Sequence, residues 1–395
     1  MRDFIRQLGL LRYMNWAMVL ATLSLLIIGV MFVYSSCYIS EDLPVRTLYK
    51  RQVMWALAGL LCYVFFAALD YRVLRRWSWT VYAGCLVLLL AVLFVGTVRE
   101  GAQRWLTLVG FDIQPSEPAK LALIIILARR LGLPGIYYAD WRRVGGVLLL
   151  LLVPVLLILK QPDLGTAMVF VPITFIMMYG AGVPLRTLGL IALVAVLAVG
   201  CVLGAVFLPE KLGFSPELQE KFTAMTGLSD YQRSRIMVFL GVADDPLGVG
   251  WNKLQSEIAV GSGGLWGKGF RNGTQNILGF LPRKVAPNDF IYSVIAEETG
   301  FMGSLGVFLL YAMVFWGGIR AALGARDKLG RLLCVGVVAL LFCHVFINIA
   351  MTVGLMPITG LPLPLLSYGG SFMLVVMAAL GMMQSVHIRA RRVIY

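Results

Sequence analysis

The sequence predicts an all-α, polytopic integral membrane protein, and two observations lead to that prediction. Hydrophobic residues make up 59% of the 395 residues and charged residues only 14%, against about 25% charged residues in an average soluble domain. Ten apolar runs are also long enough for a membrane-spanning helix, which needs about 20 mostly apolar residues. We therefore treat residues 1–395 as a single membrane domain.

The ten apolar segments are joined by short connections, with one exception. The exception is a long loop between the seventh and eighth segments, residues 209–289. The first segment is not followed by a small-residue cleavage site, so it is predicted to stay as a membrane helix and not to be a cleaved signal peptide. The predicted segments are 16–35, 52–69, 77–96, 115–131, 144–160, 164–180, 187–208, 290–319, 332–354 and 365–386.

The basic residues predict the orientation of these segments. Ten spans place both termini on one side of the membrane. With the termini in the cytoplasm, the inner segments carry 18 basic residues and the short outer segments carry 6. This asymmetry satisfies the positive-inside rule, which counts short loops. The long loop and most of the unusual polar motifs are therefore predicted to be extracytoplasmic, at the outer face of the cytoplasmic membrane.

Composition also excludes several kinds of site. The formal net charge is +14, but the positive-inside asymmetry explains much of it, so no nucleic-acid partner is expected. The six cysteines form no CxxC motif, and two histidines are too few for a His-based metal site. The sequence thus predicts neither a disulfide framework nor a zinc site.

Glu117 and Lys120 lie three residues apart at the start of the fourth segment, so they share one helix face. A charge at bilayer depth costs about 2.5–3.5 kcal/mol on insertion scales, and pairing reduces that cost. One interpretation is a structural ion pair, with Ser116 as the N-cap and Pro118 in the first turn. The other is that both side chains line an outward-facing cavity.

Asp163, in KQPDLGT, opens the sixth segment and allows two interpretations. An aspartate just before a helix is a preferred N-cap. An ionisable residue near the membrane is also a candidate for function.

The long loop contains a glycine-rich stretch, GSGGLWGKGF (261–270), with Lys268 among the glycines. Glycines let backbone N–H groups approach a phosphate closely. The GxxxxGK[ST] spacing of a Walker A motif is absent, and no strand precedes the stretch. A phosphate-binding loop and a re-entrant turn at the membrane interface both remain open.

A second glycine-rich stretch, MPITGLPLPLLSYGGS (356–371), includes three prolines and cannot form a regular helix. Non-helical backbone at membrane depth persists only where it lines a cavity or is buried in protein. This stretch therefore indicates a cavity on the outer side.

Asp289 precedes the eighth segment, which also carries Glu297 and Glu298. Ideal helix geometry places Asp289 on a stripe of small residues that allows close packing or leaves room for a ligand; the stripe continues through Ser293, Ala296, Gly300 and Ser304. Glu298 points to the opposite side, and Glu297 lies about 80° away and roughly 12 Å deeper. The paired carboxylates of glycosidases are therefore not indicated. Asp289 is either an N-cap or a lone catalytic carboxylate, with Asn288 as an alternative cap.

Several motifs, taken in order, resemble those of the shape, elongation, division and sporulation (SEDS) family of peptidoglycan glycosyltransferases, and within it the rod-shape branch. The resemblance covers nearly the whole chain, including the ten-span count. Each motif is weak alone, and their order makes the joint match specific. The motifs are GAQRWL, QPSEPAKLA, KQPDLGTA, YQRSRI, QSEIAVGSGGLWGKGF, NDFIYSVIAEETG and GLPLPLLSYGGS.

The resemblance implies a polymerase of lipid II, the undecaprenyl-pyrophosphoryl disaccharide-pentapeptide, that acts in cell elongation. It implies an essential aspartate at Asp289, an important Trp105, and a central cavity lined by Glu117 and Lys120. The family usually has His-Thr before this aspartate, whereas this chain has Pro287 and Asn288, which puts any role of that pair in doubt here.

We add further candidates for substrate binding to those that the resemblance implies. Positive charge for the leaving pyrophosphate is assigned to Lys268, Arg104 or a divalent cation such as Mg²⁺. Asp163, and Ser367 in the last motif, are placed with the cavity residues. The expected chemistry is an inverting glycosyl transfer with Asp289 as general base.

The resemblance also implies partners: a class B penicillin-binding transpeptidase and other membrane proteins of the elongation complex. Three alternatives are kept. A lipid II flippase or transporter is expected to carry polar groups near the midplane with access from both sides, whereas here they gather toward one face. A structural scaffold is a second alternative, and a division or sporulation paralogue of the same family is a third.

Overall fold

The computed structural model describes residues 11–40, 42–99, 102–108, 111–133, 141–211, 235, 237, 249–283 and 285–391. Most of the predicted loop 209–289 before residue 249 lies outside the described residues. The elements are η1 (Leu11–Tyr13), α2 (Trp16–Cys37), α3 (Leu43–Arg46), α4 (Leu48–Ala68), α5 (Arg72–Val95), β1 (Thr97–Arg99), β2 (Ala102–Leu108), β3 (Phe111–Ile113), α6 (Ser116–Leu131), α7 (Trp141–Lys160), α8 (Leu164–Ala181), α9 (Leu185–Lys211), α12 (Val249–Ser262), α13 (Thr274–Ile277), α14 (Ile291–Gly324), α15 (Lys328–Thr352) and α16 (Gly370–Arg391).

Each predicted apolar segment overlaps one long helix in the described part of the chain. Eight of these helices are long and apolar enough to cross a membrane, while α6 has only 16 residues and the apolar part of α7 covers Val144–Lys160. The chain is thus a mainly helical, multi-pass membrane protein. The last helix begins at Gly370 and not at residue 365, because Pro364 precedes a left-handed Leu365 with φ of 67°.

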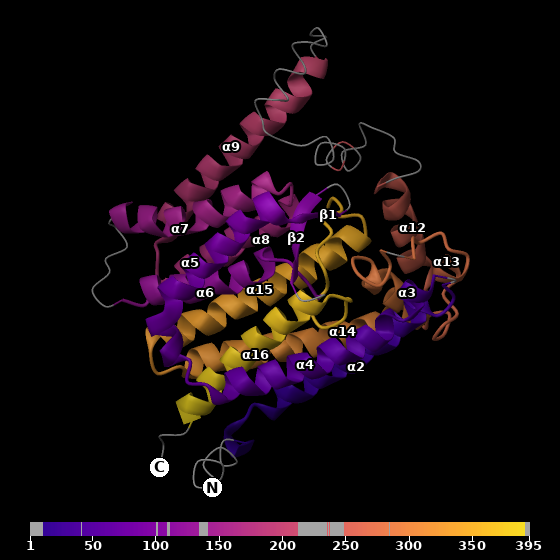
Figure 1. Ribbon diagram of the computed structural model, residues 1–395, viewed down its shortest axis with the longest axis horizontal. Coiled ribbons are helices and arrows are strands. Elements are labelled where there is room, and N and C mark those ends of the chain that lie inside the picture. Colours follow the sequence, from indigo (N-terminus) through magenta and orange to yellow (C-terminus); the bar gives the residue numbers. More distant parts are fainter. Residues whose placement is uncertain are drawn as a thin grey trace.

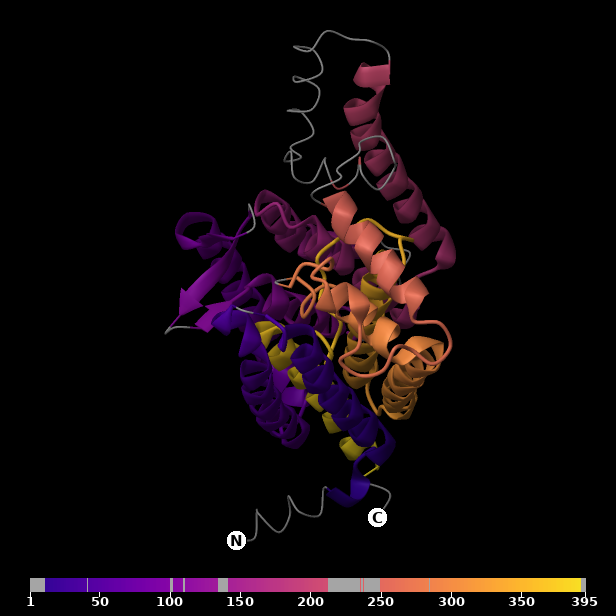
Figure 2. The ribbon, with the colours of Figure 1, turned by 90° about the vertical axis from the view of Figure 1, so that its right-hand side faces the viewer.

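The helices differ greatly in how much protein surrounds them. In their most apolar windows, 83% of the residues of α16 and 72% of those of α15 are buried, against 6% for α9. Helix α16 packs along α4 and also contacts α14 and α15. Helix α9 extends away from the other helices in both views (Figures 1 and 2). Its apolar surface therefore needs lipid, whereas α15 and α16 form the centre of the protein.

Glycines allow the close approach of α4 and α16. A Cβ atom on Gly381 would lie 2.5 Å from the Tyr63 carbonyl oxygen, and one on Gly370 would lie 2.3 Å from Cε2 of Trp55. Small residues at such crossings let backbones approach closely, and the van der Waals packing that results is one of the forces that associate helices in lipid. This packing holds the start of α16, and with it the second glycine-rich stretch, against α4.

A small antiparallel sheet between α5 and α6 was not predicted from the sequence. Its strand order is β1-β2-β3, with Thr97 opposite Trp105 and Leu106 opposite Ile113. The Ser371 hydroxyl of α16 donates to the Asp112 carbonyl of β3 at 3.0 Å. The sheet is therefore attached to the end of the bundle where α16 begins.

Helix α14 is interrupted at Gly300, whose φ of 65° and ψ of −161° are not helical. The first glycine-rich stretch closes this break with four backbone hydrogen bonds. The amides of Lys268 and Gly269 donate to the carbonyls of Glu297 and Glu298, at 3.0 and 2.9 Å. In return, the amides of Phe301 and Met302 donate to the carbonyls of Gly264 and Leu265, at 2.9 and 3.1 Å.

The glycines of this stretch are required by the closeness of that contact. A Cβ on Gly263 would lie 2.1 Å from the Ala296 carbonyl oxygen, and one on Gly267 would lie 2.2 Å from that of Glu298. We call residues 263–269 the glycine plug, because they fill the break in α14. Of the two interpretations left open above, the structure supports a re-entrant turn: the plug amides of Lys268 and Gly269 bind carbonyl oxygens.

Candidate functional site

Asp289 lies in a turn before α14. The helix begins at Ile291 with Phe290 at the N-cap position, so the expectation that Asp289 or Asn288 caps it is wrong. The small-residue stripe below Asp289 is occupied by protein. The Ser256 hydroxyl of α12 lies 2.7 Å from that of Ser293, and the glycine plug covers Ala296. The stripe therefore serves packing, and space for a ligand has to lie elsewhere around Asp289.

The second glycine-rich stretch passes directly over the Asp289 carboxylate. A Cβ on Gly360, where φ is 73°, would lie 3.4 Å from Oδ2 of Asp289 and 3.7 Å from Nη1 of Arg235. Arg235 also donates from Nη1 to the Ile358 carbonyl at 2.9 Å. The absence of a side chain at Gly360 thus keeps a space that a carboxylate and a guanidinium both face.

The irregular backbone of this stretch is supported by side chains from several helices. Each named carbonyl oxygen accepts a hydrogen bond: Leu361 from Asn348 at 2.7 Å, Pro364 from Tyr311 at 2.5 Å, and Ser367 from Gln52 at 3.1 Å. Unsatisfied backbone groups at membrane depth cost several kcal/mol each. The donors therefore hold this stretch in one conformation over Asp289 without a helix.

Two side chains connect the stretch to the turn that carries Asp289. Asn348 donates from Nδ2 to the Asp289 carbonyl at 2.9 Å as well as to Leu361. The Ser367 hydroxyl donates to the Asn288 carbonyl at 2.5 Å and accepts from the Leu363 amide at 2.7 Å. Ser367, predicted as a cavity residue, thus contacts the backbone next to Asp289 and positions it.

Glu117 and Lys120 form the predicted ion pair, with Nζ 2.9 Å from Oε1. Lys120 also lies 2.8 Å from Nε2 of His344, whose Nδ1 is 3.2 Å from the Pro362 carbonyl. Because an ammonium only donates, Nε2 accepts and Nδ1–H donates to Pro362. The pair is therefore linked through His344 to the stretch above Asp289.

At this ion pair the structure has neither the expected Ser116 helix cap nor an open cavity around the two charged side chains. Helix α6 begins at Ser116 with Pro115 at the N-cap position, so the expected Ser116 cap is wrong. Glu117 and Lys120 are 2% and 0% exposed, so they are enclosed by protein here. Their contact with substrate stays a prediction.

Asp163 is the N-cap of α8, as one interpretation predicted, and accepts from the Thr166 amide at 3.0 Å. Its Oδ2 also accepts from Gln114 Nε2 at 3.0 Å and lies 3.8 Å from Nη1 of Arg104. A cap alone would need one oxygen. The second oxygen connects Arg104 of β2 and Gln114, just before α6, to the start of α8. These contacts bring the motifs GAQRWL, QPSEPAKLA and KQPDLGTA together.

The described contacts of two other predicted residues, Trp105 and Lys268, are with groups other than Asp289. Trp105 is partly exposed on β2, opposite Thr97. Lys268 lies in the glycine plug, and its ammonium donates to Ser262, Thr274 and Glu297 at 2.7, 2.5 and 2.6 Å. These bonds engage all three donors of a lysine. A pyrophosphate at Lys268 would therefore have to compete with Glu297.

Glu297 and Glu298 both bind the segment after the plug, although the ideal helix directed them apart. A Cβ on Gly273 would lie 2.9 Å from Oε2 of Glu297 and 3.3 Å from Oε1 of Glu298. Glu298 accepts from the Arg271 amide at 2.9 Å and from the Ser35 hydroxyl of α2 at 2.6 Å. These two carboxylates therefore anchor the loop, and Asp289 is the carboxylate that faces Gly360.

Three residues of the site were missed from the sequence. Arg235 belongs to the YQRSRI motif, but nothing in that motif indicates that it faces the same space at Gly360 as Asp289. His344 and Asn348 lie four residues apart in the apolar α15, so they share a face. A histidine and an asparagine at that spacing in a membrane helix were the available signal.

Comparisons with known proteins identify the family of this chain. A family model described as FTSW_RODA_SPOVE, cell cycle protein, matches residues 16–392. The chain belongs to the FtsW/RodA/SpoVE family. This match extends over every long helix described above and includes all the candidate site residues.

Individual members of the FtsW/RodA/SpoVE family match over most of their length. Peptidoglycan glycosyltransferase MrdB of Escherichia coli strain K12 is 36% identical over 375 residues, 95% of this chain and 94% of the relative. Peptidoglycan glycosyltransferase RodA of Treponema pallidum is 33% identical, covering 95% and 98%. Stage V sporulation protein E of Bacillus subtilis is 37% identical, covering 93% and 95%.

Solved structures of family members have the same fold. A chain of a peptidoglycan synthase complex superposes with a TM-score of 0.75 at 31% identity, covering 96% of this chain and 99% of that one. The rod shape-determining protein RodA of Thermus thermophilus superposes with a TM-score of 0.65 at 28% identity, covering 95% and 96%.

Proposed function

We propose that this protein is a peptidoglycan glycosyltransferase that polymerises lipid II during cell elongation, at the outer face of the cytoplasmic membrane. The names of its relatives support the activity, since MrdB and RodA are both peptidoglycan glycosyltransferases. The observation that carries the proposal is that Asp289 and Arg235 both face the space at Gly360. A carboxylate can serve as the general base and a guanidinium can bind a pyrophosphate, which are two functions that this glycosyl transfer needs.

In the proposed reaction, Asp289 is the general base. It takes the proton of the 4-hydroxyl of the acceptor sugar as that oxygen attacks C1 of the donor sugar. The C1–O bond to undecaprenyl pyrophosphate breaks, and the configuration at C1 inverts. One carboxylate suffices for this displacement, which fits the engagement of Glu297 and Glu298 in the loop anchor. A positioned base contributes roughly 10²- to 10⁴-fold to the rate.

Arg235 is the nearest described cation to this space and supplies positive charge for the pyrophosphate. A guanidinium presents donors in a planar fork that matches phosphate oxygens. Its own bond to the Ile358 carbonyl holds it beside the stretch that covers Asp289. Arg104 and Lys268, proposed earlier for this role, instead lie against Asp163 and Glu297.

Among the described residues, no group of three or more His, Cys, Asp or Glu side chains is placed to hold a metal ion. Mg²⁺ usually binds through one or two carboxylates plus substrate phosphates. We propose that a divalent cation enters together with the pyrophosphate, and activity assays can test this. The roles given to Asp289 and Arg235 do not depend on it.

The protein's partner in this function is proposed to be a class B penicillin-binding transpeptidase. The structure with the TM-score of 0.75 is a peptidoglycan synthase complex that coordinates polymerization and crosslinking, which supports the pairing. We also propose that other membrane proteins of the elongation complex bind this chain, and that both termini lie in the cytoplasm.

Asp289→Asn tests the assignment in purified protein with labelled lipid II. We expect glycan-strand formation to fall by at least about 100-fold, with an unchanged elution profile and thermal midpoint. The matched control is Asp42→Asn, since Asp42 is exposed and makes no side-chain cap bond. Full activity of Asp289→Asn would exclude it as the base.

The same assay separates polymerase from transporter, because detergent removes any membrane to cross. Wild-type protein that forms no polymer with its transpeptidase partner present, yet moves lipid II across vesicles, would favour the transporter. Complementation of elongation, division and sporulation mutants would then distinguish the paralogues.

A further inference from the structure

A polar cavity lies at the opposite end of the bundle from Asp289. Its volume is about 150 Å³, and it opens where the start of α5, the end of α6 and the start of α15 meet. Four basic side chains and one acidic side chain line it: Arg72, Arg75, Arg129, Lys328 and Asp327. A water occupies about 30 Å³ in the liquid, so the cavity has room for a tetrahedral anion.

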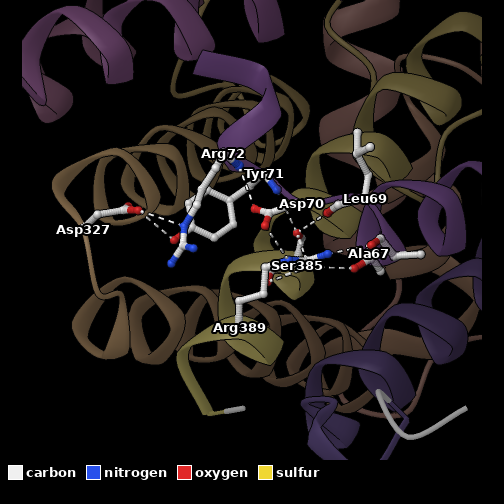
Figure 3. A network of polar contacts seen from close by, with 9 residues as sticks. Ala67, Leu69, Asp70, Tyr71, Arg72, Asp327, Ser385 and Arg389 are labelled. Atoms are coloured by element: carbon white, nitrogen blue, oxygen red, sulfur yellow. Dashed lines mark hydrogen bonds and ion pairs between the residues drawn. The ribbon is translucent and has the colours of Figure 1, made fainter. Parts of the chain in front are cut away.

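The acidic side chain of the cavity is already engaged. Asp327 accepts from the Gly330 amide at 2.6 Å as the N-cap of α15 and from the Tyr71 hydroxyl at 3.0 Å. It also lies 3.5 Å from Nε of Arg72 (Figure 3). One carboxylate offsets one of the four positive charges that line the cavity, and Asp327 is nearest to Arg72, so an excess of positive charge remains.

The walls around Asp327 are held by a second set of contacts, shown beside it in Figure 3. Arg389 of α16 donates to the Ala68 carbonyl at 2.6 Å and lies 3.5 Å from Asp70. The Ser385 hydroxyl donates to the Leu69 carbonyl at 2.5 Å. The turn between α4 and α5 is thus held by side chains of α16, and Tyr71 and Arg72 lead from this turn to Asp327.

The other basic residues leave positive charge unbalanced. Arg129 uses Nη1 for the Arg75 carbonyl and the Ser78 hydroxyl, at 3.1 and 3.0 Å. Within the described ranges, the side chains of Arg75 and Lys328 make no ion pair or hydrogen bond. Like charges gathered in a hollow raise the local potential and attract an anion.

We propose that this cavity binds a phosphate group. Arginine forks match phosphate oxygens, and a lysine adds a point charge. The orientation predicted from the sequence places this end at the cytoplasmic surface, where basic pockets between helices bind anionic lipid headgroups. The phosphate belongs either to such a headgroup or to a soluble phosphate. From Lys328 to Asn348, α15 rises about 30 Å, so this site is separate from Asp289.

Retention of lipid by the full-length protein tests the lipid source. Detergent-purified protein is incubated with phosphatidylglycerol or phosphatidylcholine, and bound lipid is counted by native mass spectrometry. The variant Arg75→Gln/Lys328→Gln removes two cavity charges, and Arg76→Gln/Arg130→Gln removes two exposed charges outside the cavity. We expect selective phosphatidylglycerol binding to fall about 25-fold in the first variant only, at roughly fivefold per basic residue.

Inorganic phosphate tests the soluble source. Thermal stabilisation by phosphate over chloride at equal ionic strength, lost only in Arg75→Gln/Lys328→Gln, would assign a soluble phosphate if phosphatidylglycerol shows no selectivity. Equal responses of the two double variants in both experiments would overturn the proposal. Should the double variant not elute as a folded protein, Lys328→Gln alone is compared with Arg130→Gln, and equal responses overturn the proposal in the same way.

Discussion

The two glycine-rich stretches look alike in sequence but do different things. The glycine plug, residues 263–269, contacts the broken backbone of α14, and its glycines are needed because carbonyl oxygens lie within 2.2 Å of the Cβ positions of Gly263 and Gly267. The stretch around Gly360 instead leaves a space beside the Asp289 carboxylate, which would lie 3.4 Å from a Cβ. Glycine content alone therefore does not show what a stretch does: a glycine can allow a close backbone contact, as at Gly263 and Gly267, or leave a space beside a reactive group, as at Gly360.

The largest expected effect is on folding, from Gly267→Ala. The methyl group would meet the Glu298 carbonyl oxygen at 2.2 Å, at a φ of 77°. The overlap and the left-handed conformation together should cost about 3 kcal/mol or more. We expect little folded protein by fluorescence-detected size-exclusion chromatography.

The matched control is Gly261→Ala in α12, where nothing lies within 4 Å of the added Cβ. It should be neutral or stabilising by about 0.4–1 kcal/mol. Normal folded yield of Gly267→Ala would show that the plug does not need to approach α14 so closely.

The second effect is on activity, from Gly360→Ala. The added methyl enters the space that Asp289 and Arg235 both face, and the left-handed φ costs only about 1–2 kcal/mol. We expect polymerisation to fall about 100-fold, as small misplacements of catalytic groups do, with a modest fall in the thermal midpoint. Gly369→Ala, whose Cβ meets Phe372 at an ordinary 3.6 Å, should keep full activity. Equal activities of the two variants would remove Gly360 from the site.

The third effect is shared between stability and turnover. Asn348→Ala leaves the carbonyls of Asp289 and Leu361 without their donor, at about 1–3 kcal/mol for each unsatisfied buried group. We expect a lower thermal midpoint and about a tenfold lower kcat, with KM for lipid II little changed, because Asn348 positions Asp289 without touching substrate. A raised KM with normal kcat would contradict the positioning role.

The smallest effect concerns Lys268, for which two predictions now compete. If Lys268 serves the plug, a double-mutant cycle with Lys268→Met and Glu297→Gln should show coupling of about 1–3 kcal/mol in stability, and each variant should keep its KM for lipid II. If it binds pyrophosphate, Lys268→Met alone should raise that KM. The measurement is steady-state polymerisation beside thermal unfolding of all four proteins.

The sequence predicted the long helices well because the length of an apolar run directly reflects the thickness of the membrane. It missed the sheet at 97–113, whose strands are short and lie between two apolar segments. It also directed Glu298 away from Glu297, because an ideal helix says nothing of a loop that binds both. Asp289 and Arg235, which both face the space at Gly360, lie 54 positions apart in the sequence, and no local pattern records such an arrangement.

The break in α14 also has a consequence for synthesis. The groups that satisfy it, from Gly264 to Gly269, precede Gly300 in the chain, so the ribosome completes them first. Since chains begin to fold from the N-terminal side during synthesis, α14 can enter the bilayer with its missing hydrogen bonds already provided. A circular permutant that places residues 249–283 after α16 would reverse this order. Helix α14 would then be made before the groups that form hydrogen bonds with its backbone at the break.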